Sequence, residues 1–218
     1  MTPAILGNTC ASESSVPRVI AGVDEVGRGA LFGPVVAAAV ILPVAVQRGL
    51  AQAGVTDSKA LSPERRSALY SQIQASSICA IGLASVAEID RLNILQASLV
   101  AMKRAVEHLP LQPTYCLVDG NQRIPNFALA QKAMVKGDQR VLAIAAASII
   151  AKVWRDRLIV RLAAKYPHYD LAANKGYGTA KHKAGLKVAG LTRYHRRSFR
   201  TCQALPTRIA TDRQGQLF

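Results

Sequence analysis

The sequence has no apolar run of the ~20 residues that spanning a bilayer requires, so we expect no transmembrane helix. Its longest apolar run, from Gly33 to Pro43, suits a buried strand instead. The first residues lack a basic segment followed by an apolar stretch, so we expect no secretory signal, no membrane partner and a cytoplasmic protein. Half of the 218 residues are hydrophobic, which favours one folded domain over disorder.

Paired cysteines are also missing. The four cysteines are widely spaced, with no CxxC pair and no histidine at zinc-ligand spacing: Cys10, Cys79, Cys116 and Cys202. We therefore expect neither a disulfide framework nor a zinc site. Cys79 and Cys116 lie in apolar segments typical of strands, where we expect buried free thiols.

Acidic residues are scarce: 13 Asp and Glu stand against 28 Lys and Arg, which gives a net charge of +15. A balance of this kind favours a polyanionic partner, although a merely soluble basic surface would also produce it. The segment from Lys165 to Arg200 carries nine basic residues and one acidic residue, Asp170, with tyrosines and histidines between them. This pattern is typical of a surface that contacts nucleic-acid phosphates.

Hydrophobic patterns predict a mixed α/β domain. Two apolar runs joined by Gly27–Gly29 indicate a hairpin. Ser85 and Glu88 fit a capping box at the start of a helix whose apolar positions repeat up to Val106. We expect strands at residues 18–24, 35–42, 78–84, 114–118 and 133–135, and helices from Ser62, from 85 to 106 and from 142 to 165.

The order of these elements, a hairpin first and then strands alternating with helices, predicts one mixed five-stranded sheet flanked by helices, with a helical basic C-terminal region. The domain is expected at residues 18–200, after a flexible tail at 1–17 and before a second tail at 201–218. The terminal QGQLF is only weakly similar to the short apolar-aromatic motif that binds a replication clamp, and a disordered tail is the preferred interpretation.

Carboxylates stand at the ends of the predicted strands. Asp24 and Glu25 precede the glycine turn, Asp119 ends the fourth strand, and Asp138 follows the fifth. Strand ends are where α/β sheets bind ligands, and oxygen ligands without imidazoles select Mg²⁺ or Mn²⁺. Each aspartate by itself is equally compatible with a turn or a helix cap. The Asp-Glu pair argues more strongly for a site, because buried charge requires a partner.

Several motifs follow one another in the order of a known family. They are DEVGRG at 24–29, TDSK at 56–59, LVDG at 117–120, KGD at 136–138, AAASIIAKVWRDR at 145–157, NKGYGT at 174–179 and HRRSF at 195–199. Together they resemble ribonuclease HII proteins over about residues 18–200. The resemblance implies a ribonuclease H-like fold and an endonuclease, acting as a monomer, that cuts the RNA strand of RNA–DNA hybrids and duplex DNA 5′ to embedded ribonucleotides.

The same resemblance implies four metal-binding acidic residues, Asp24, Glu25, Asp119 and Asp138, which would hold Mn²⁺ or Mg²⁺, two ions during catalysis. Asp156 competes with Asp138 for the fourth place. We prefer Asp138 because it follows a strand directly, whereas Asp156 lies four residues after Lys152 on a helix, where a salt bridge explains it.

Substrate recognition is assigned by resemblance to Gly27, Arg28, Gly29 and Tyr177, which would sense the 2′-hydroxyl and the following deoxyribose. From the residues alone, the glycine turn is also compatible with an ordinary tight hairpin. Candidates for phosphate contacts are Thr56, Ser58, Lys59, Ser148 and Lys152. Ser148 and Lys152 share one helix face, where a surface pair is an equally good interpretation.

Three alternatives remain open at this stage. A ribonuclease HIII-like nuclease would carry an N-terminal substrate-binding domain and would lack the arginine of the turn, whereas only about 17 residues precede the first strand and Arg28 is present. A non-catalytic nucleic-acid-binding module would use the basic C-terminal half of the chain and would not need carboxylates at the strand ends. A kinase of related fold would need a GxxxxGK[ST] loop, which the sequence does not contain.

Overall fold

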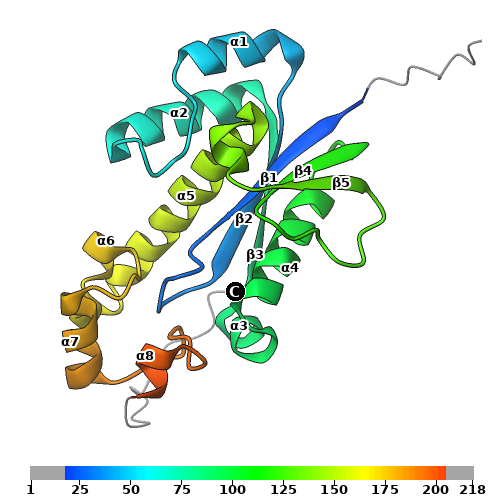
Figure 1. Ribbon diagram of the computed structural model, residues 1–218. Helices are drawn as coiled ribbons and strands as arrows, with labels where there is room; N and C mark the ends of the chain where they lie inside the picture. The colour runs from blue at the N-terminus through cyan, green and yellow to red at the C-terminus, as the bar shows by residue number, and fades with distance from the viewer. Residues whose placement is uncertain (1–17, 205–218) are drawn as a thin grey trace, which may run out of the picture.

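The computed structural model describes residues 18–204, and the tails expected at residues 1–17 and beyond Ala204, including QGQLF, lie outside the described residues. A five-stranded sheet runs through the centre in the order β3-β2-β1-β4-β5 (Figure 1). β1–β2 and β2–β3 pair antiparallel, whereas β1–β4 and β4–β5 pair parallel, which confirms the predicted mixed sheet. The strands are β1 (Ile20–Val26), β2 (Val35–Ile41), β3 (Ile78–Ala84), β4 (Tyr115–Asp119) and β5 (Ala130–Met134).

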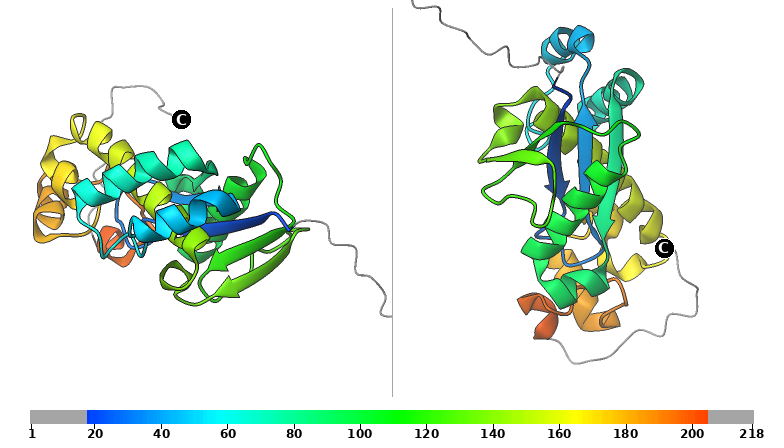
Figure 2. Two further views of the ribbon diagram at one scale, coloured as in Figure 1. Left: turned by 90° about the horizontal axis from the view of Figure 1, so that it is seen from above. Right: turned by 90° about the vertical axis from the view of Figure 1, so that its right-hand side faces the viewer.

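Helices cover both faces of the sheet. In Figures 1 and 2, α3 and α4 lie on one face, α5 with α1 and α2 on the other, and α6 to α8 gather at one end. Within residues 18–204, none of the helices has the length and apolar character needed to cross a membrane. The helices are α1 (Val44–Gln52), α2 (Pro63–Ser76), α3 (Val86–Leu92), α4 (Ile94–Glu107), α5 (Leu142–Ala163), α6 (Leu171–Asn174), α7 (Ala180–Ala189) and α8 (Arg200–Gln203), with 3₁₀ turns η1 (Gly137–Gln139) and η2 (Pro167–Tyr169).

β2 is buried along its whole length because helices pack on both of its sides. Successive side chains of a strand point to opposite faces, so Ala37 and Ala39 pack in the cluster with α4, and Ala38 and Val40 in the cluster with α5. The small alanines allow both helices to approach the sheet closely. This explains why the run from Gly33 to Pro43 is apolar throughout rather than alternating.

Glycine in β1 sets the position of α5. A methyl group at Gly22 would overlap the backbone of Ala143, in the first turn of the helix. The helix therefore lies directly against β1, two residues before Asp24, and brings Ser148 to the carboxylates of the strand. A glycine that looks ordinary in the sequence thus sets the distance between two parts of the candidate site.

Three elements differ from the sequence-based expectation. The single helix predicted over residues 85–106 is wrong: it is divided at Asn93, whose φ of 70° interrupts the helix while its side chain caps α4 through the Gln96 N–H at 3.1 Å. The predicted Ser85–Glu88 capping box is present at the start of α3. β5 begins three residues earlier than expected and ends one residue earlier. α1, which follows Pro43, was not predicted at all.

The three described cysteines are free. Cys116 and Cys202 are buried, and burial raises the pKa of each thiol to about 11. Cys79 is only half-buried, which corrects the expectation of full burial: β3 lies at the edge of the sheet. Cys10 lies outside the described residues.

The C-terminal region has a polar core built on two histidines. His182 and His195 are buried, with their Nε2 atoms 3.1 Å apart. The Thr192 N–H donates to His195 Nδ1 at 3.0 Å, so the proton of His195 is on Nε2 and is donated to His182. His182 in turn donates from Nδ1 to the Tyr177 carbonyl at 3.0 Å. Both rings are therefore neutral in the folded protein.

We predict that Gly22→Ala destabilises the protein by about 3 kcal/mol or more, because the obstacle to the new methyl group is helix backbone that cannot move aside alone. The matched control is Gly49→Ala on exposed α1, where a methyl group meets nothing within 4 Å. That change should stabilise by about 0.5–1 kcal/mol. Urea unfolding of both variants measures the difference, and equal stabilities would contradict the close approach of α5.

We also predict that stability falls as the pH drops below about 6.5. Burial, followed by the neighbouring His182, lowers the pKa of His195 to about 3, whereas an unfolded histidine titrates near 6.5. Between these values the unfolded chain binds more protons, so His195 stabilises the fold above pH 6.5 and loses about 2 kcal/mol of that contribution by pH 5.

Urea unfolding at pH 7.5 and pH 5 tests this prediction by comparing wild type with His195→Gln, because the comparison cancels other titrating groups. His195→Gln should show the smaller loss of stability on acidification. A matched change at the exposed His168, His168→Gln, should behave as wild type does. Equal losses in wild type and His195→Gln would contradict the assignment.

Candidate active site

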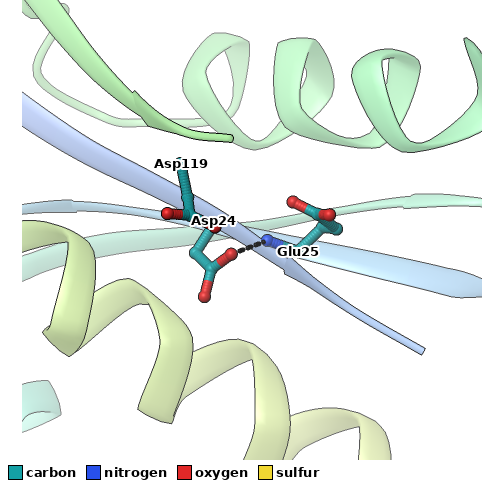
Figure 3. Close-up of side chains that lie close together, drawn as sticks. All are labelled: Asp24, Glu25 and Asp119. Carbon is teal, nitrogen blue, oxygen red and sulfur yellow. Dashed lines mark hydrogen bonds between the residues drawn. The ribbon is translucent and has the colours of Figure 1, made fainter. Parts of the chain in front are cut away.

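Three carboxylates meet at the ends of two parallel strands. Asp24 and Glu25 lie in β1, and Asp119 is the last residue of β4. The parallel register pairs Val23 with Val118, so the aspartates that follow each valine lie side by side. One carboxylate oxygen from each of the three acids lies within 4.8 Å of the others. Figure 3 shows the three side chains in the space between α4 and α5.

Asp24 is 5% exposed. Its Oδ1 accepts a hydrogen bond from the Glu25 N–H at 2.7 Å, and the Ser148 hydroxyl of α5 also hydrogen-bonds to this carboxylate. The Ser148 hydroxyl lies 2.8 Å from that of Ser58. Burial raises the pKa of Asp24 well above its usual value, and the charges of Glu25 and Asp119 raise it further.

Glu25 has a basic neighbour. Arg28 Nη1 lies 3.0 Å from Glu25 Oε1 in an i,i+3 ion pair. Burial raises the pKa of Glu25 and the charge of Asp119 adds to this, while the Arg28 guanidinium opposes both. The net direction is upward, so the arginine does not fully offset the burial of the carboxylate.

This set of donors fits a hard divalent cation. Three negative charges within a few ångströms repel one another, and a bound cation would remove the repulsion that raises the pKa of Asp24 and Glu25. All donors are carboxylate oxygens, which suit Mg²⁺ or Mn²⁺ better than zinc. The residues present therefore fit the ions that the sequence suggests.

Asp138 lies near this group but outside it. It belongs to η1, where the preceding Gly137 donates its N–H to Asp119 Oδ1 at 2.7 Å. Asp138 is 8% exposed, and burial raises its pKa. The charges of Asp119 and Asp57 raise that pKa further. Asp138 is thus close enough to Asp119 to interact with it electrostatically, but it is not one of the three acids that meet.

Asp156, the competing fourth acid, is engaged in a salt bridge. Its Oδ1 accepts from Lys152 Nζ at 3.0 Å, one helical turn away on α5, and both side chains are 17% exposed. Its position is thus the one that a salt-bridge interpretation of the sequence predicts.

The turn at Gly27–Gly29 lies beside Tyr177. Gly27 has a φ of 88°, which glycine adopts readily, and the side chain of Arg155 packs against its Cα where another residue would place a Cβ. Ala30, the residue that follows the turn, forms an isolated β-bridge with Tyr177. The Tyr177 ring is half-buried, with Lys152 Nζ and Arg155 Cζ each 5.7 Å from its centroid.

Exposure separates the five candidates for phosphate contacts. Thr56 and Lys59 are exposed, and Lys152 is partly exposed beside Tyr177. Ser58 and Ser148 are 3% and 5% exposed and bond to each other beneath Asp24. The geometry therefore suits the two serines to orienting Asp24, and the other three to contacting a ligand at the surface.

Sequence reasoning missed two buried arginines, Arg155 and Arg196, and two buried histidines, His182 and His195. One signal was present for Arg155: it follows Ser148 by seven residues and therefore lies on the same face of α5. Arg196 lies in the HRRSF segment that carries the resemblance, but nothing local marked it as buried, because one arginine in a basic segment resembles its exposed neighbours.

A large hollow lies away from the carboxylates. It has a volume of about 630 Å³, is lined by residues of α2 and α5 with Lys175, and includes the stacked pair Arg157 and Tyr70. Trp154 also borders it. None of the three clustered acids lines this hollow, so its size does not mark the catalytic chemistry, which the carboxylate geometry locates better.

Comparison with known proteins supports the same interpretation. A family model described as Ribonuclease HII matches residues 21–202. The Ribonuclease HII of Acaryochloris marina is 64% identical over 85% of this chain and 94% of its own. That of Trichodesmium erythraeum is 64% identical over 84% of this chain and 87% of its own.

Solved structures have the same fold. The ribonuclease H2 of Pyrococcus horikoshii is 29% identical, with a TM-score of 0.72 over 84% of this chain and 95% of that one. The RNase HII from the PCNA complex of Archaeoglobus fulgidus is also 29% identical, with a TM-score of 0.70 over 82% of this chain and 93% of that one. Bst-RNase HIII in complex with Mn²⁺ is 19% identical, with a TM-score of 0.70 over 85% of this chain and 68% of that one, and shows the fold alone.

The family match extends over nearly all of the described residues and includes both the carboxylates and the glycine turn. The expected resemblance is thereby confirmed, and the non-catalytic and kinase alternatives are set aside. The chain belongs to the ribonuclease HII family and is a metal-dependent endonuclease that hydrolyses the RNA strand of RNA–DNA hybrids.

Proposed function

We propose that the protein also cuts duplex DNA on the 5′ side of a single embedded ribonucleotide and leaves 3′-hydroxyl and 5′-phosphate ends. One observation carries this proposal: the carboxylates of Asp24, Glu25 and Asp119 meet at the base of the turn that pairs with Tyr177. Chemistry and sugar recognition then act on neighbouring atoms of one strand. An enzyme arranged in this way needs only one ribonucleotide in its site.

The proposed metal ligands are Asp24, Glu25, Asp119 and Asp138. Two Mg²⁺ or Mn²⁺ ions bound there would supply an activated water and stabilise the charge that develops on the leaving oxygen. The protein's own contribution is to hold the ligands still. Ser148 orients Asp24, the Gly137 N–H orients Asp119, and Arg28 orients Glu25.

Reading of the 2′-hydroxyl is proposed for Gly27, Arg28 and Gly29, because backbone groups at a glycine can approach a sugar without a Cβ between them. Arg28 and Gly29 are exposed at the tip of the turn. Tyr177 is proposed to pack its ring against the deoxyribose that follows. Lys152 beside this ring supplies a positive charge for the phosphate between the two sugars.

The basic surface as a whole is proposed to bind the duplex. A net charge of +15 favours phosphate contacts, and the exposed Thr56 and Lys59 are further candidates for such contacts; the charge of Lys59 acts on Asp138. The remaining parts of the proposal are a monomer located in the cytoplasm, which acts on RNA–DNA hybrids and on ribonucleotide-containing duplex DNA. The basic lining of the hollow between α2 and α5 suits the same partner.

We expect the wild type, supplied with Mg²⁺ or Mn²⁺, to nick a duplex holding one ribonucleotide on its 5′ side and to leave the all-DNA duplex intact. Asp119→Asn should lower the rate at least about 100-fold while the duplex still binds, because it removes a proposed metal ligand and leaves the basic surface unchanged. Gel analysis of end-labelled strands reads out both the position and the rate. A wild type that binds the duplex but never cuts it would contradict the proposal.

A matched pair of variants decides the fourth ligand. Asp138→Asn should raise the metal concentration needed for half-maximal activity by about 10-fold or more, since Asp138 lies in the electrostatic field of Asp119. Asp156→Asn loses only the bond to Lys152 and should change activity by no more than about fivefold. Metal titrations of both variants test this, and the reverse order of effects would give the fourth place to Asp156.

A further inference from the structure

Two positive side chains are buried without acidic partners beside the candidate site. Arg155 of α5 and Arg196, which follows His195, are both 0% exposed. Among the residues that the structure describes, neither lies within salt-bridge distance of a carboxylate. Removing a guanidinium from water costs several kcal/mol unless hydrogen bonds replace its hydration. Their hydrogen bonds therefore indicate what they do.

Arg155 joins both sides of the recognition surface. Its Nε donates to the Pro34 carbonyl at 3.1 Å, and its Nη2 to the Phe32 carbonyl at 2.9 Å. Its Nη1 donates to the Lys175 carbonyl at 2.9 Å. The first two acceptors lie in the segment that leaves the glycine turn, and the third lies two residues before Tyr177. One planar group thus fixes the spacing between the two segments.

Arg196 holds the turn itself. Its Nη1 donates to the Arg28 carbonyl at 2.8 Å and its Nε to the Gly33 carbonyl at 3.0 Å. Its own backbone N–H donates to the Leu31 carbonyl at 2.9 Å. The remaining nitrogen, Nη2, is buried and finds no hydrogen-bond partner in the described part of the chain. Arg196 therefore holds these backbone carbonyls while one of its own buried donors stays without a partner in the described part of the chain.

The bond to the Arg28 carbonyl has a geometric consequence. The carbonyl and the N–H of a trans peptide point in opposite directions, so drawing the Arg28 carbonyl inward turns the Gly29 N–H outward. Gly29 is exposed, and its N–H donates to no acceptor among the described residues. A buried guanidinium thus presents a free backbone donor at the surface of the turn.

Tyr177 is tied to the same frame. The Leu31 N–H donates to the Gly176 carbonyl at 2.8 Å, next to the bridge between Ala30 and Tyr177. His182 holds the Tyr177 carbonyl from the other side. The position of the ring relative to the Gly29 N–H therefore depends on backbone segments that the two buried arginines hold by hydrogen bonds to their carbonyl groups.

We propose that Arg196, together with Arg155, is a positioning residue that sets the Gly29 N–H and the Tyr177 ring at the separation needed to read an RNA-to-DNA step. The inference rests on the proposed function, and it adds two residues that act without touching the nucleic acid. Because both are fully buried, their effect reaches the substrate only through the backbone that they hold.

The test compares Arg196→Met and Arg196→Lys with wild type in three measurements: kcat and KM on a duplex with one ribonucleotide, Kd for the all-DNA duplex, and Tm. Arg196→Met should lower kcat by about 10- to 100-fold, because a displacement of about 1 Å at the reacting sugar has that effect. Its Kd for all-DNA duplex should stay within about twofold of wild type, since phosphate contacts lie on exposed residues. Arg196→Lys keeps the charge and the length but not the paired donors, and should still lose at least about fivefold in kcat.

Arg104→Met is the matched control. Arg104 is only partly buried, but like Arg196 it donates to a backbone carbonyl, that of Leu83 at 2.8 Å, and it also forms an ion pair with Glu88 on α3. This change should lower Tm, while kcat of the folded enzyme remains within about twofold of wild type. It separates a loss of stability from a loss of positioning.

Two results would overturn the inference by itself. The first is an unchanged kcat in both folded Arg196 variants, which would make Arg196 purely structural. The second is a loss of all-DNA affinity as large as the loss in kcat, which would mean that Arg196 acts through its charge. If the wild type cuts RNA–DNA hybrids but not the duplex with one ribonucleotide, the proposed function fails instead, and this inference fails with it.

Discussion

The structure depends on the burial of three like charges in one corner of a strongly basic protein. Asp24, Glu25 and Asp119 are held there by donors from three separate segments, the Ser148 hydroxyl, the Arg28 guanidinium and the Gly137 amide. Each donor satisfies part of one carboxylate and leaves other lone pairs available. Burial raises the pKa of Asp24 and of Glu25, and the charge of Asp119 raises both further, so these donors do not fully offset the burial of the carboxylates. A bound divalent cation would supply the compensation that the chain itself does not provide.

The buried positive charges are kept apart from these acids. Arg155 and Arg196 donate to carbonyl oxygens, and Arg28 is the only arginine or lysine that forms an ion pair with a member of the three-acid cluster within residues 18–204. An arginine of α5 paired directly with Asp24 would neutralise the site and compete with the metal. Separation lets the acids bind cations while the guanidinium groups organise backbone.

Local patterns predicted much of this fold and failed where tertiary contacts decide. The apolar β2, the capping box at Ser85 and the length of α5 follow from periodicity, and the parallel strand ends that bring Asp24 to Asp119 follow from element order. The break at Asn93 could not be predicted from periodicity, because a left-handed residue that caps the next helix leaves the apolar repeat intact. The burial of Arg196 and His195 could not be predicted either, because it depends on carbonyl groups and rings from distant segments, which no local pattern records.

Order of synthesis gives the contact between Arg196 and the glycine turn a further meaning. The guanidinium and the Arg28 carbonyl that it holds are separated by 168 positions in the chain. The sheet and α5 can assemble before the last segment emerges from the ribosome, because their contacts close earlier in the sequence. The turn, however, gains its hydrogen bond from Arg196 only when nearly the whole domain has been synthesised. A nascent chain can thus fold its carboxylate corner while the glycine turn still lacks its hydrogen bond to Arg196, so the proposed recognition surface is the last part of the domain to form.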